Sequence, residues 1–552
     1  MPQVEDADAP VLASPDEDTL KDAEHFATEA AAWQAGGDPD HFRQFRLVHG
    51  VYGIRGREDE FMVRVKLPYG QVTRRQWSAL AQCASACADG RAHLTTRQCI
   101  QYHHVPLSRV PEVLQRLGGV GLTTREACGN AVRNVTGCPL AGVCPLEVTD
   151  VRHVARGVVR HLLRHPAAQD LPRKFKIAFS GCARDCALAR IHDLGFVAVT
   201  DHDGRPGFRV WAAGGLGAAP HPAVPLASFV PPEQVQALAE AAVRVFSRLG
   251  NRRNRNRARL KFVADQLGAA GLRAEVAAEG LRLGYALPAL ADFSAPRLQL
   301  PALPAAREVP GQDPRPGFEA WRQTSTVRQA QSGFAAVFVA PSGGNLAAAQ
   351  METLAILSGR FGDGRLRLAL TQDVVVPWVR EQDLPDVHAS LDRVGLGAPG
   401  ALRAANVTGC PGAATCNLAL TASNALAREL RRVLLERPEY GLADDLEDLR
   451  IKVSGCPNSC GHHVVAGIGL QGGATRVGDR EVPMYRILLG GDATGEQAHM
   501  AVPITQVPAA NVPEAVLRII DLYRANRQPE ESFGRWVRRR LNTEVIGAAA
   551  RT

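Results

Sequence analysis

The sequence predicts an α+β protein that is internally duplicated and pseudo-two-fold, each half being an α/β module followed by a second, cysteine-bearing α/β module. Three observations predict this fold class. The spacing C-x5-C followed by C-x3-C occurs twice in the 552-residue chain. Other segments of the two halves match one another in the same order, as in FMVRVKLPYG and AAVFVAPSGG. Within each half, segments that alternate apolar and polar residues are interleaved with helix-like segments.

The first half begins with an acidic segment and then alternates strands and helices. Residues 1–38 predict a disordered tail because their start is acidic and proline-bearing. FMVRVKL (61–67) alternates like a strand. Thr73 is placed to cap a helix that runs through QWSALAQCASAC. HLTTRQCIQYHHV (93–105) is again strand-like, and LSRVPEVLQRLGG (107–119) is helix-like.

The same order of elements in the second half gives the domain boundaries. A proline-rich segment between the halves has neither a helical nor a strand period, so we expect a linker there. The expected segments are the tail at 1–38, the first half-domain at 39–122, the first cysteine-bearing module at 123–293, the linker at 294–317, the second half-domain at 318–398 and the second cysteine-bearing module at 399–545.

Composition excludes few function classes but favours an anionic ligand. Apolar residues make up 45% and charged residues 22% of the chain, which is ordinary for a globular protein. The net charge of +8 suggests an anionic partner, cofactor or substrate. No signal-peptide pattern or long uncharged apolar run is evident, so we expect a cytoplasmic protein with no membrane partner.

The two cysteine sets have the pattern of an iron–sulfur site. In the second half, Cys410 and Cys416 stand in TGCPGAATC, and Cys456 and Cys460 stand in SGCPNSC. Four thiolates on two neighbouring loops can hold a cubane cluster. In a cytosolic protein, twelve cysteines favour metal or redox chemistry over disulfides. The first half repeats the pattern with Cys138, Cys144, Cys182 and Cys186.

The two halves differ in their cations, which predicts one anion site rather than two. Most first-half cations have lost their positive counterpart beside the cysteine motifs, and only Lys176 keeps one. A cluster beside a basic pocket indicates reduction of an anion, binding of an acidic cofactor, or both. The aligned pairs are Arg64 and Val337, Arg97 and Gln372, Arg133 and Ala405, Lys174 and Asp448, and Lys176 and Arg450.

These motifs resemble those of the siroheme-dependent sulfite and nitrite reductases over roughly residues 40–545. The resemblance implies that each half is a ferredoxin-like module followed by a siroheme and cluster module. It implies catalytic contacts to the substrate for Arg64 in FMVRVKLP, Arg133 in GNAVRNV, and Lys174 and Lys176 in LPRKFK. The physics fits, because a bound anion that gains electrons needs nearby cations.

The resemblance also implies the cofactor ligands. GCPNSCG resembles the loop whose last cysteine bridges the [4Fe–4S] cluster and the siroheme iron, which makes Cys460 a cluster ligand and the axial ligand. Asn458 is expected to order this loop. The other implied cluster ligands are Cys410, Cys416 and Cys456, and the implied siroheme contacts are Arg97 and Gln98 in TTRQ and Arg259 and Lys261 in NRNRARLKF.

The first-half cysteine set departs from the commoner family pattern, in which only the second-half set holds a cluster. A second cluster at Cys138, Cys144, Cys182 and Cys186 is one possibility. Because the matching cations have been lost, the sequence favours a buried remnant of the duplication instead.

The expected reaction is an assimilatory-type, six-electron reduction of sulfite to sulfide by an oxidoreductase. Relatives that reduce sulfite tend to keep both lysines of the LPRKFK-like segment, and this chain keeps Lys176. The alternative on the same site is the reduction of nitrite to ammonia. No flavin or nicotinamide fingerprint is evident, so reduced ferredoxin is the expected donor and a separate flavoprotein reductase subunit is the alternative.

Two other classes are compatible with parts of the sequence. A zinc-stapled protein that binds nucleic acid would suit the net charge, but C-x5-C is a poor zinc spacing and aromatic residues are only 5%. We therefore expect no nucleic-acid partner. A non-catalytic tetrapyrrole carrier would need no lysine pair.

Overall fold

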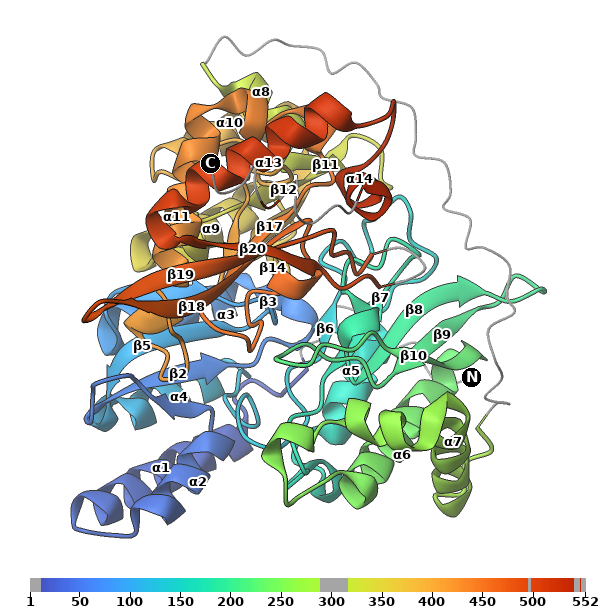
Figure 1. The fold of residues 1–552 in the computed structure, drawn as a ribbon. Helices are drawn as coiled ribbons and strands as arrows, with labels where there is room; N and C mark the ends of the chain where they lie inside the picture. The colour runs from blue at the N-terminus through green and yellow to red at the C-terminus, as the bar shows by residue number, and fades with distance from the viewer. Residues whose placement is uncertain (1–10, 288–315, 495–497, 541–546, 548–552) are drawn as a thin grey trace.

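The computed structural model describes residues 11–287, 316–494, 498–540 and 547, and it consists of two similar halves (Figure 1). In the view of Figure 1, the first half is blue to green and lies mostly below the yellow-to-red second half. Each half contributes to one antiparallel and one mixed sheet, each of five strands. The predicted duplicated α+β fold is therefore confirmed.

The two antiparallel sheets exchange an edge strand. The first has the order β1-β2-β5-β4-β13 and the second β11-β12-β15-β14-β3, so each takes its last strand from the opposite half. The first comprises β1 (Val51–Gly53), β2 (Glu60–Val65), β4 (Arg91–Leu94), β5 (Ile100–Pro106) and β13 (Asn345–Ala347). The second comprises β3 (Gln71–Thr73), β11 (Thr326–Arg328), β12 (Phe334–Val339), β14 (Arg365–Leu368) and β15 (Val374–Arg380).

The helices of these modules share one hydrophobic core that spans both halves. Trp77 and Met351 are fully buried in it, and the Trp77 ring N–H donates to the Met351 carbonyl oxygen at 2.8 Å. The helices are α1 (Glu17–Gln34), α2 (Pro39–Val48), α3 (Arg74–Cys87), α4 (Val110–Gly118), α8 (Phe318–Ser325), α9 (Ala348–Phe361) and α10 (Leu384–Asp392).

Each mixed sheet places two cysteine loops at one edge. The orders are β10-β9-β8-β7-β6 and β16-β17-β18-β19-β20, with β6, β7 and β8 parallel, and likewise β16, β17 and β18. The strands are β6 (Thr136–Gly137), β7 (Ile177–Ser180), β8 (Leu194–Thr200), β9 (Pro206–Ala212), β10 (Val224–Val230), β16 (Thr408–Gly409), β17 (Ile451–Ser454), β18 (Ile468–Val477), β19 (Arg480–Leu489) and β20 (Val502–Pro508). Because parallel strands end at the same edge, the loops after β6 and β7, and after β16 and β17, are neighbours.

Helices pack against these sheets through shared hydrophobic cores. They are α5 (Arg152–Leu162), α6 (Val235–Leu249), α7 (Leu260–Arg282), α11 (Ser423–Glu436), α12 (Pro438–Gly441), α13 (Val512–Asn526) and α14 (Phe533–Arg540). Among the described residues, no helix is long and apolar enough to cross a membrane.

Two predicted elements are confirmed, and the predicted tail is corrected. Thr73 caps α3 through a capping box with Gln76, as predicted, and α4 lies within the predicted segment 107–119. The predicted tail, residues 1–38, is wrong for residues 17–34, which form α1. Its Ala23 and Phe26 are buried against the first half, because burial of this apolar face outweighs the acidic composition. Of the predicted linker, 294–317, all but the last two residues lie outside the described residues.

The predicted single strand at 93–105 is a hairpin, β4 and β5, with a tight turn at residues 95–99. Gln98 takes a positive φ of 51° in this turn, which ends one strand and reverses the chain. The alternating pattern missed the turn because no Gly, Pro, Asn or Asp marks it.

Strand pairing corrects the predicted counterpart of Arg64. The last residues of β2 and β12 pair with the first residues of β5 and β15, which fixes the same register in both halves. Arg64 is the second-to-last residue of β2, and Phe338 is the second-to-last residue of β12. The counterpart of Arg64 is therefore Phe338 and not Val337.

The counterpart of Arg97 is corrected in the same way. Gln98 and Gln372 occupy equivalent positions: both have positive φ, and each side-chain amide donates at 2.7 Å to a carbonyl oxygen of the opposite half. Arg97 therefore corresponds to Thr371 and not to Gln372. Both corrected counterparts are uncharged, so the loss of cations from the second half stands.

Candidate active site

One large cavity of about 610 Å³ lies between the cations of the first half and the cysteine loops of the second. Its lining contains many Arg and Lys side chains and no Asp or Glu. Such an unbalanced lining has the electrostatics of a site for a strongly anionic ligand. The cationic lining residues are Arg64, Arg97, Arg133, Arg173, Lys174, Lys176, Arg255, Arg257, Arg259 and Lys261.

The first-half sheets present most of these cations. Arg64 lies on β2, Arg97 lies in the β4–β5 turn, and Lys174 and Lys176 precede β7. Arg133 precedes β6, and its guanidinium donates to the carbonyl oxygens of residues 127 and 129 at 2.9 and 2.7 Å. These hydrogen bonds hold the Arg133 charge in place before any ligand arrives.

The lysine pair is held in an environment that disfavours its charged form. Burial and then the neighbouring Arg259 guanidinium lower the pKa of Lys174 to about 7. Burial and then Arg97 lower the pKa of Lys176 well below its usual value. An anion in the cavity would favour protonation of both lysines, so ligand binding and proton uptake are coupled there.

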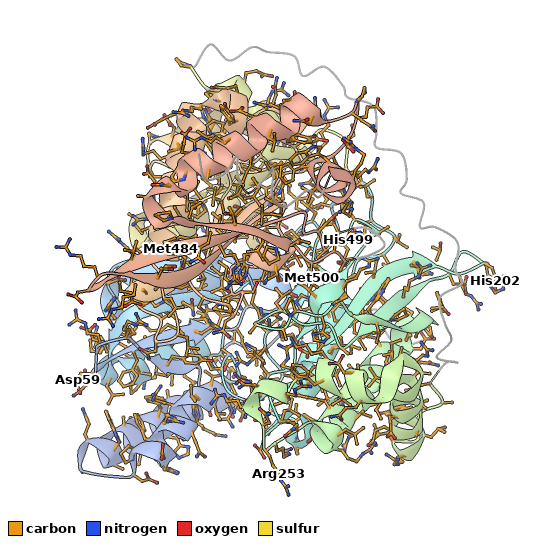
Figure 2. The ribbon with its side chains drawn as sticks, viewed as in Figure 1. Asp59, His202, Arg253, Met484, His499 and Met500 are labelled. Atoms are coloured by element: carbon orange, nitrogen blue, oxygen red, sulfur yellow. The ribbon has the colours of Figure 1, made fainter. Side chains whose placement is uncertain are left out.

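The start of α7 supplies a second group of cations. Arg259 donates to both carboxylate oxygens of Asp193 at 3.1 and 2.7 Å, and Asp193 also accepts the Lys176 backbone N–H at 2.9 Å. The ammonium of Lys261 donates to the carbonyl oxygen of Leu216 at 3.3 Å. Arg253, nearby in sequence, lies on the outer surface and outside the cavity lining (Figure 2).

Hydrogen bonds to sulfur and backbone shape the second-half cysteine loops. The Gly455 N–H donates to the Cys410 sulfur at 3.3 Å, and the Asn458 amide donates to the Cys456 sulfur at 3.5 Å. Donors of this kind stabilise thiolates and tune a bound cluster. The Thr96 hydroxyl donates to the Cys460 carbonyl oxygen at 2.7 Å and joins this loop to the β4–β5 turn of the other half.

The second-half thiols fit a polynuclear cluster better than a single metal ion. Four sulfurs round one zinc lie about 3.8 Å apart, since each Zn–S bond is about 2.3 Å. In the described chain, the groups of three or more ligand atoms within 4.8 Å of one another contain no cysteine. The exposed Cys460 and the buried Cys410 line the cavity, so a cluster here adjoins any anionic cofactor.

Most of the predicted site residues meet at this cavity, and Gln98 does not. Gln98 is fully buried beside it, where its amide donates to the Gly137 and Leu368 carbonyl oxygens. The Gln98 side chain therefore links the two halves, and its predicted contact with the cofactor stays a prediction. The predicted residues in the lining are Arg64, Arg97, Arg133, Lys174, Lys176, Arg259, Lys261, Asn458, Cys410 and Cys460. Cys416 and Cys456 stand on the same loops outside the lining.

Several lining residues were not predicted. Arg173, Arg255 and Arg257 lie in the same basic segments of sequence as residues that were predicted. These basic segments could therefore have predicted them as well. His462, which received no predicted role, is 4% exposed, and its Nδ1 has no partner in the described structure. Burial, followed by the charge of Lys452, keeps the pKa of His462 well below its usual value.

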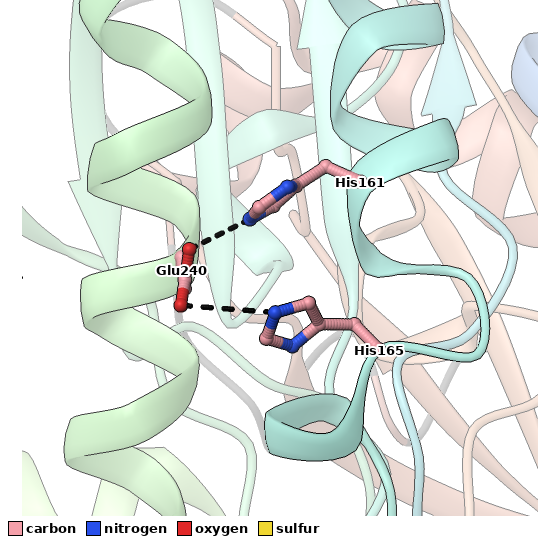
Figure 3. A group of neighbouring side chains, drawn as sticks. All are labelled: His161, His165 and Glu240. Carbon is pink, nitrogen blue, oxygen red and sulfur yellow. Dashed lines mark hydrogen bonds and ion pairs between the residues drawn. The ribbon is translucent and has the colours of Figure 1, made fainter.

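A second group of potential metal ligands lies elsewhere, between α5 and α6 (Figure 3). His161 and His165 both face Glu240, with ring nitrogens 2.7 and 3.9 Å from its carboxylate oxygens. The Arg244 guanidinium also donates to this carboxylate at 2.8 Å, and His165 Nδ1 accepts the Ala167 N–H. These partners already satisfy the group, so it is interpreted as an ion-pair network and not a metal centre.

Comparisons with known proteins give one consistent family. The family model described as "Nitrite and sulphite reductase 4Fe-4S domain" matches residues 128–283 and 402–540. The model described as "Nitrite/Sulfite reductase ferredoxin-like half domain" matches residues 54–120 and 327–394. Both models match twice, once in each half.

Similar proteins carry names of both activities. A sulfite reductase (ferredoxin) of Mycobacterium tuberculosis is 31% identical over 480 residues, which cover 86% of this chain and 82% of that protein. An assimilatory ferredoxin-dependent nitrite reductase of Haloferax mediterranei is 31% identical over 513 residues, covering 90% and 85%. The solved structure of the Mycobacterium tuberculosis NirA protein superposes with a TM-score of 0.80 at 28% identity and covers 94% of each chain.

Proposed function

This chain belongs to the nitrite and sulfite reductase family, an oxidoreductase family whose cofactors are siroheme and a [4Fe–4S] cluster, and we propose that it reduces sulfite to sulfide by six electrons. The observation that carries the proposal is the cavity lined by ten Arg and Lys residues and no carboxylate, next to Cys460. Siroheme bears many carboxylates, and sulfite is a dianion, so both suit this lining.

The residues present fit the two cofactors. The second-half set would hold the cluster, and Cys460, which lines the cavity, is the proposed ligand of the siroheme iron. Arg97, Arg259 and Lys261 would contact siroheme carboxylates. When bound, siroheme and the cluster supply the site that takes up electrons one at a time and delivers them to the anion.

The protein's own cations then position and protonate the substrate. Arg64 and Arg133 provide fixed positive charge, since an arginine stays protonated at any working pH. Lys174, with a pKa near 7, can hold a proton while an anion is bound and release it as negative charge builds on the substrate. The reduction of sulfite to sulfide consumes a proton for each electron, so Lys174 would be reprotonated from solvent between transfers.

The choice of sulfite rests on Lys176. This second lysine lines the cavity. Burial lowers its pKa, and a ligand with two negative charges restores its protonated form more strongly than a ligand with one. Nitrite is a monoanion and gains less from it. Reduction of nitrite to ammonia remains the second candidate, because relatives named as nitrite reductases match as well as those named as sulfite reductases.

Reduced ferredoxin is the proposed electron donor. Relatives of both activities carry ferredoxin in their names. A small acidic donor also suits a chain with a net charge of +8. A flavoprotein reductase subunit is the alternative donor. Steady-state reduction of sulfite and of nitrite by one preparation, with an artificial one-electron donor, tests the substrate without depending on the natural donor.

Replacing Lys176 by asparagine is expected to lower kcat/KM for sulfite more than for nitrite. The dianion loses more electrostatic stabilisation than the monoanion when one positive charge is removed. The quantity to measure is the ratio of the two specificity constants, since both rates can fall together.

The conservative variant Lys176→Arg keeps the charge and should leave this ratio close to that of the wild type. A wild-type preference for nitrite of more than about tenfold, or about 1.4 kcal/mol, would contradict the proposed substrate. In that case nitrite reduction is the activity.

A further inference from the structure

The first-half cysteine set has no place in the function described so far, yet it is complete. Of the first-half cations at the site, Arg64, Arg97, Arg133 and Lys174 have uncharged or acidic counterparts in the second half. The cysteine pattern has lost nothing in either half. If the first-half cysteines bound no ligand, we would expect some of them to have been replaced, as the second-half counterparts of the cations were.

The backbone of the first-half set has the same shape as that of the cluster loops. Asp185 and Leu188 have φ values of 51° and 54°, and Ser459 and His462, at the same distances after Cys182 and Cys456, have φ values of 55° and 65°. Positive φ is uncommon for residues other than glycine. The same two strained positions occur in both halves. The first-half cysteine loops therefore keep the backbone conformation of the second-half cluster loops, and each pair of loops is called a cradle below.

The neighbouring half covers both cradles in the same way. The Arg55 side chain donates to the carbonyl oxygen of Ala419 at 2.7 Å, just after the Cys410–Cys416 loop. The Ala330 N–H donates to the carbonyl oxygen of Val143 at 2.9 Å, within the Cys138–Cys144 loop. Both cysteine loops are therefore held in place from the opposite half.

The four first-half thiols lie on two neighbouring loops, after the parallel strands β6 and β7. The Cys138 N–H donates to the Phe179 carbonyl oxygen of β7 at 3.0 Å. In the second half, the Cys410 N–H makes the equivalent bond to the Val453 carbonyl oxygen of β17 at 3.2 Å. No three of the first-half sulfurs fall within 4.8 Å of one another among the described ligand groups, which is too open for one tetrahedral zinc ion.

Apolar side chains occupy the position beside the first-half cradle that corresponds to the cofactor cavity. A cluster of buried apolar side chains occupies the position that corresponds to the wall of the active-site cavity. By strand register, Phe338 corresponds to Arg64, Ala369 to Thr95 and Val375 to Gln101. Leu140, from the first cysteine loop itself, packs against this cluster. The place of a second siroheme is therefore filled largely by apolar side chains, and the buried Arg367 guanidinium there donates to the carbonyl oxygens of Pro139 and Ala141.

We propose that Cys138, Cys144, Cys182 and Cys186 bind a second [4Fe–4S] cluster that has no siroheme beside it. Cys144 and Cys186 are partly exposed, and the exposed Arg184 lies beside them. A cluster at this edge can take one electron from a one-electron donor, such as dithionite or a reduced ferredoxin, without making or breaking a bond. It would be an electron carrier and not a site of anion reduction.

Counting iron and labile sulfide in anaerobically purified holoenzyme tests the proposal. We expect about eight non-haem irons and about eight sulfides per siroheme, in place of about four of each. Cys182→Ser should lose about half of both and keep the siroheme absorption bands. The matched control Cys87→Ser, in the core of α3, should lose neither. About four irons in the wild type, or zinc or disulfides at this set, would overturn the proposal.

Spectroscopy gives a test that does not depend on any variant folding. After dithionite reduction, a second cluster should give a paramagnetic signal that stays the same when cyanide binds the siroheme, because nothing couples the two. A dithionite-reduced holoenzyme whose whole cluster signal responds to cyanide would exclude it. Both readouts are independent of whether sulfite or nitrite is the substrate.

Discussion

Replacing Cys460 by serine is expected to abolish reduction of both sulfite and nitrite. Serine is a poor substitute for the soft thiolate that an iron–sulfur cluster needs. Cys460 is also the exposed thiol in the cavity wall, held there by the Thr96 hydroxyl on its carbonyl oxygen, so it is proposed to reach the siroheme iron. Assays with an artificial donor, iron analysis and the visible spectrum measure the loss.

Serine at Cys410, Cys416 or Cys456 should likewise abolish activity and disturb the cluster. The matched control is Cys186→Ser, since Cys186 holds the place of Cys460 in the first half. This control should keep the siroheme bands and the siroheme-coupled cluster. Normal turnover by Cys460→Ser would show that the second-half set does not carry the electrons to the anion.

Replacing Arg133 or Lys174 by alanine is expected to slow anion reduction by roughly ten- to a thousand-fold, by analogy with the loss of a preorganised charge donor. Both side chains line the cavity, and Arg133 is held by backbone carbonyl oxygens in the arrangement that a ligand needs. The rates are measured for sulfite and nitrite with an artificial donor, together with siroheme content per chain.

The siroheme content separates a catalytic effect from loss of the cofactor. Arg253→Ala is a suitable control, because it removes an exposed arginine outside the cavity lining and should leave the rates unchanged. If Arg133→Ala and Lys174→Ala both turn over near the wild-type rate on both anions, these residues do not stabilise the reacting anion.

Local signals in the sequence were sufficient for much of the fold. The helix α3 starts at a capping box between Thr73 and Gln76, and both groups are close in sequence. The cysteine spacings are equally local, because each pair lies on one loop. The duplication was visible for the same reason: matching segments occur in the same order whatever their contacts.

Elements without a strong local signal were misassigned. The composition of residues 1–38 suggested disorder, but α1 buries Ala23, Phe26 and Ala30, an apolar stripe at helical spacing that the acidic composition concealed. The counterparts of Arg64 and Arg97 were displaced by one residue because letter matches alone do not fix a register. Only the strand ladders, and the paired amides of Gln98 and Gln372, decide it.

The sequence by itself therefore determined the duplicated fold, the two cysteine sets and the half that carries the cations. Most of the site residues that it predicted line the active-site cavity. These conclusions depend on residue type and on spacing along the chain, which need no knowledge of distant contacts.

The tertiary structure decided how the halves meet. The exchange of β3 and β13 between the sheets places first-half cations opposite second-half thiols, and the Gln98 amide links the two halves. It also showed that Phe338 and its neighbours fill the place of a second siroheme. These outcomes depend on packing between residues more than two hundred positions apart, and neither periodicity nor motif spacing encodes such contacts.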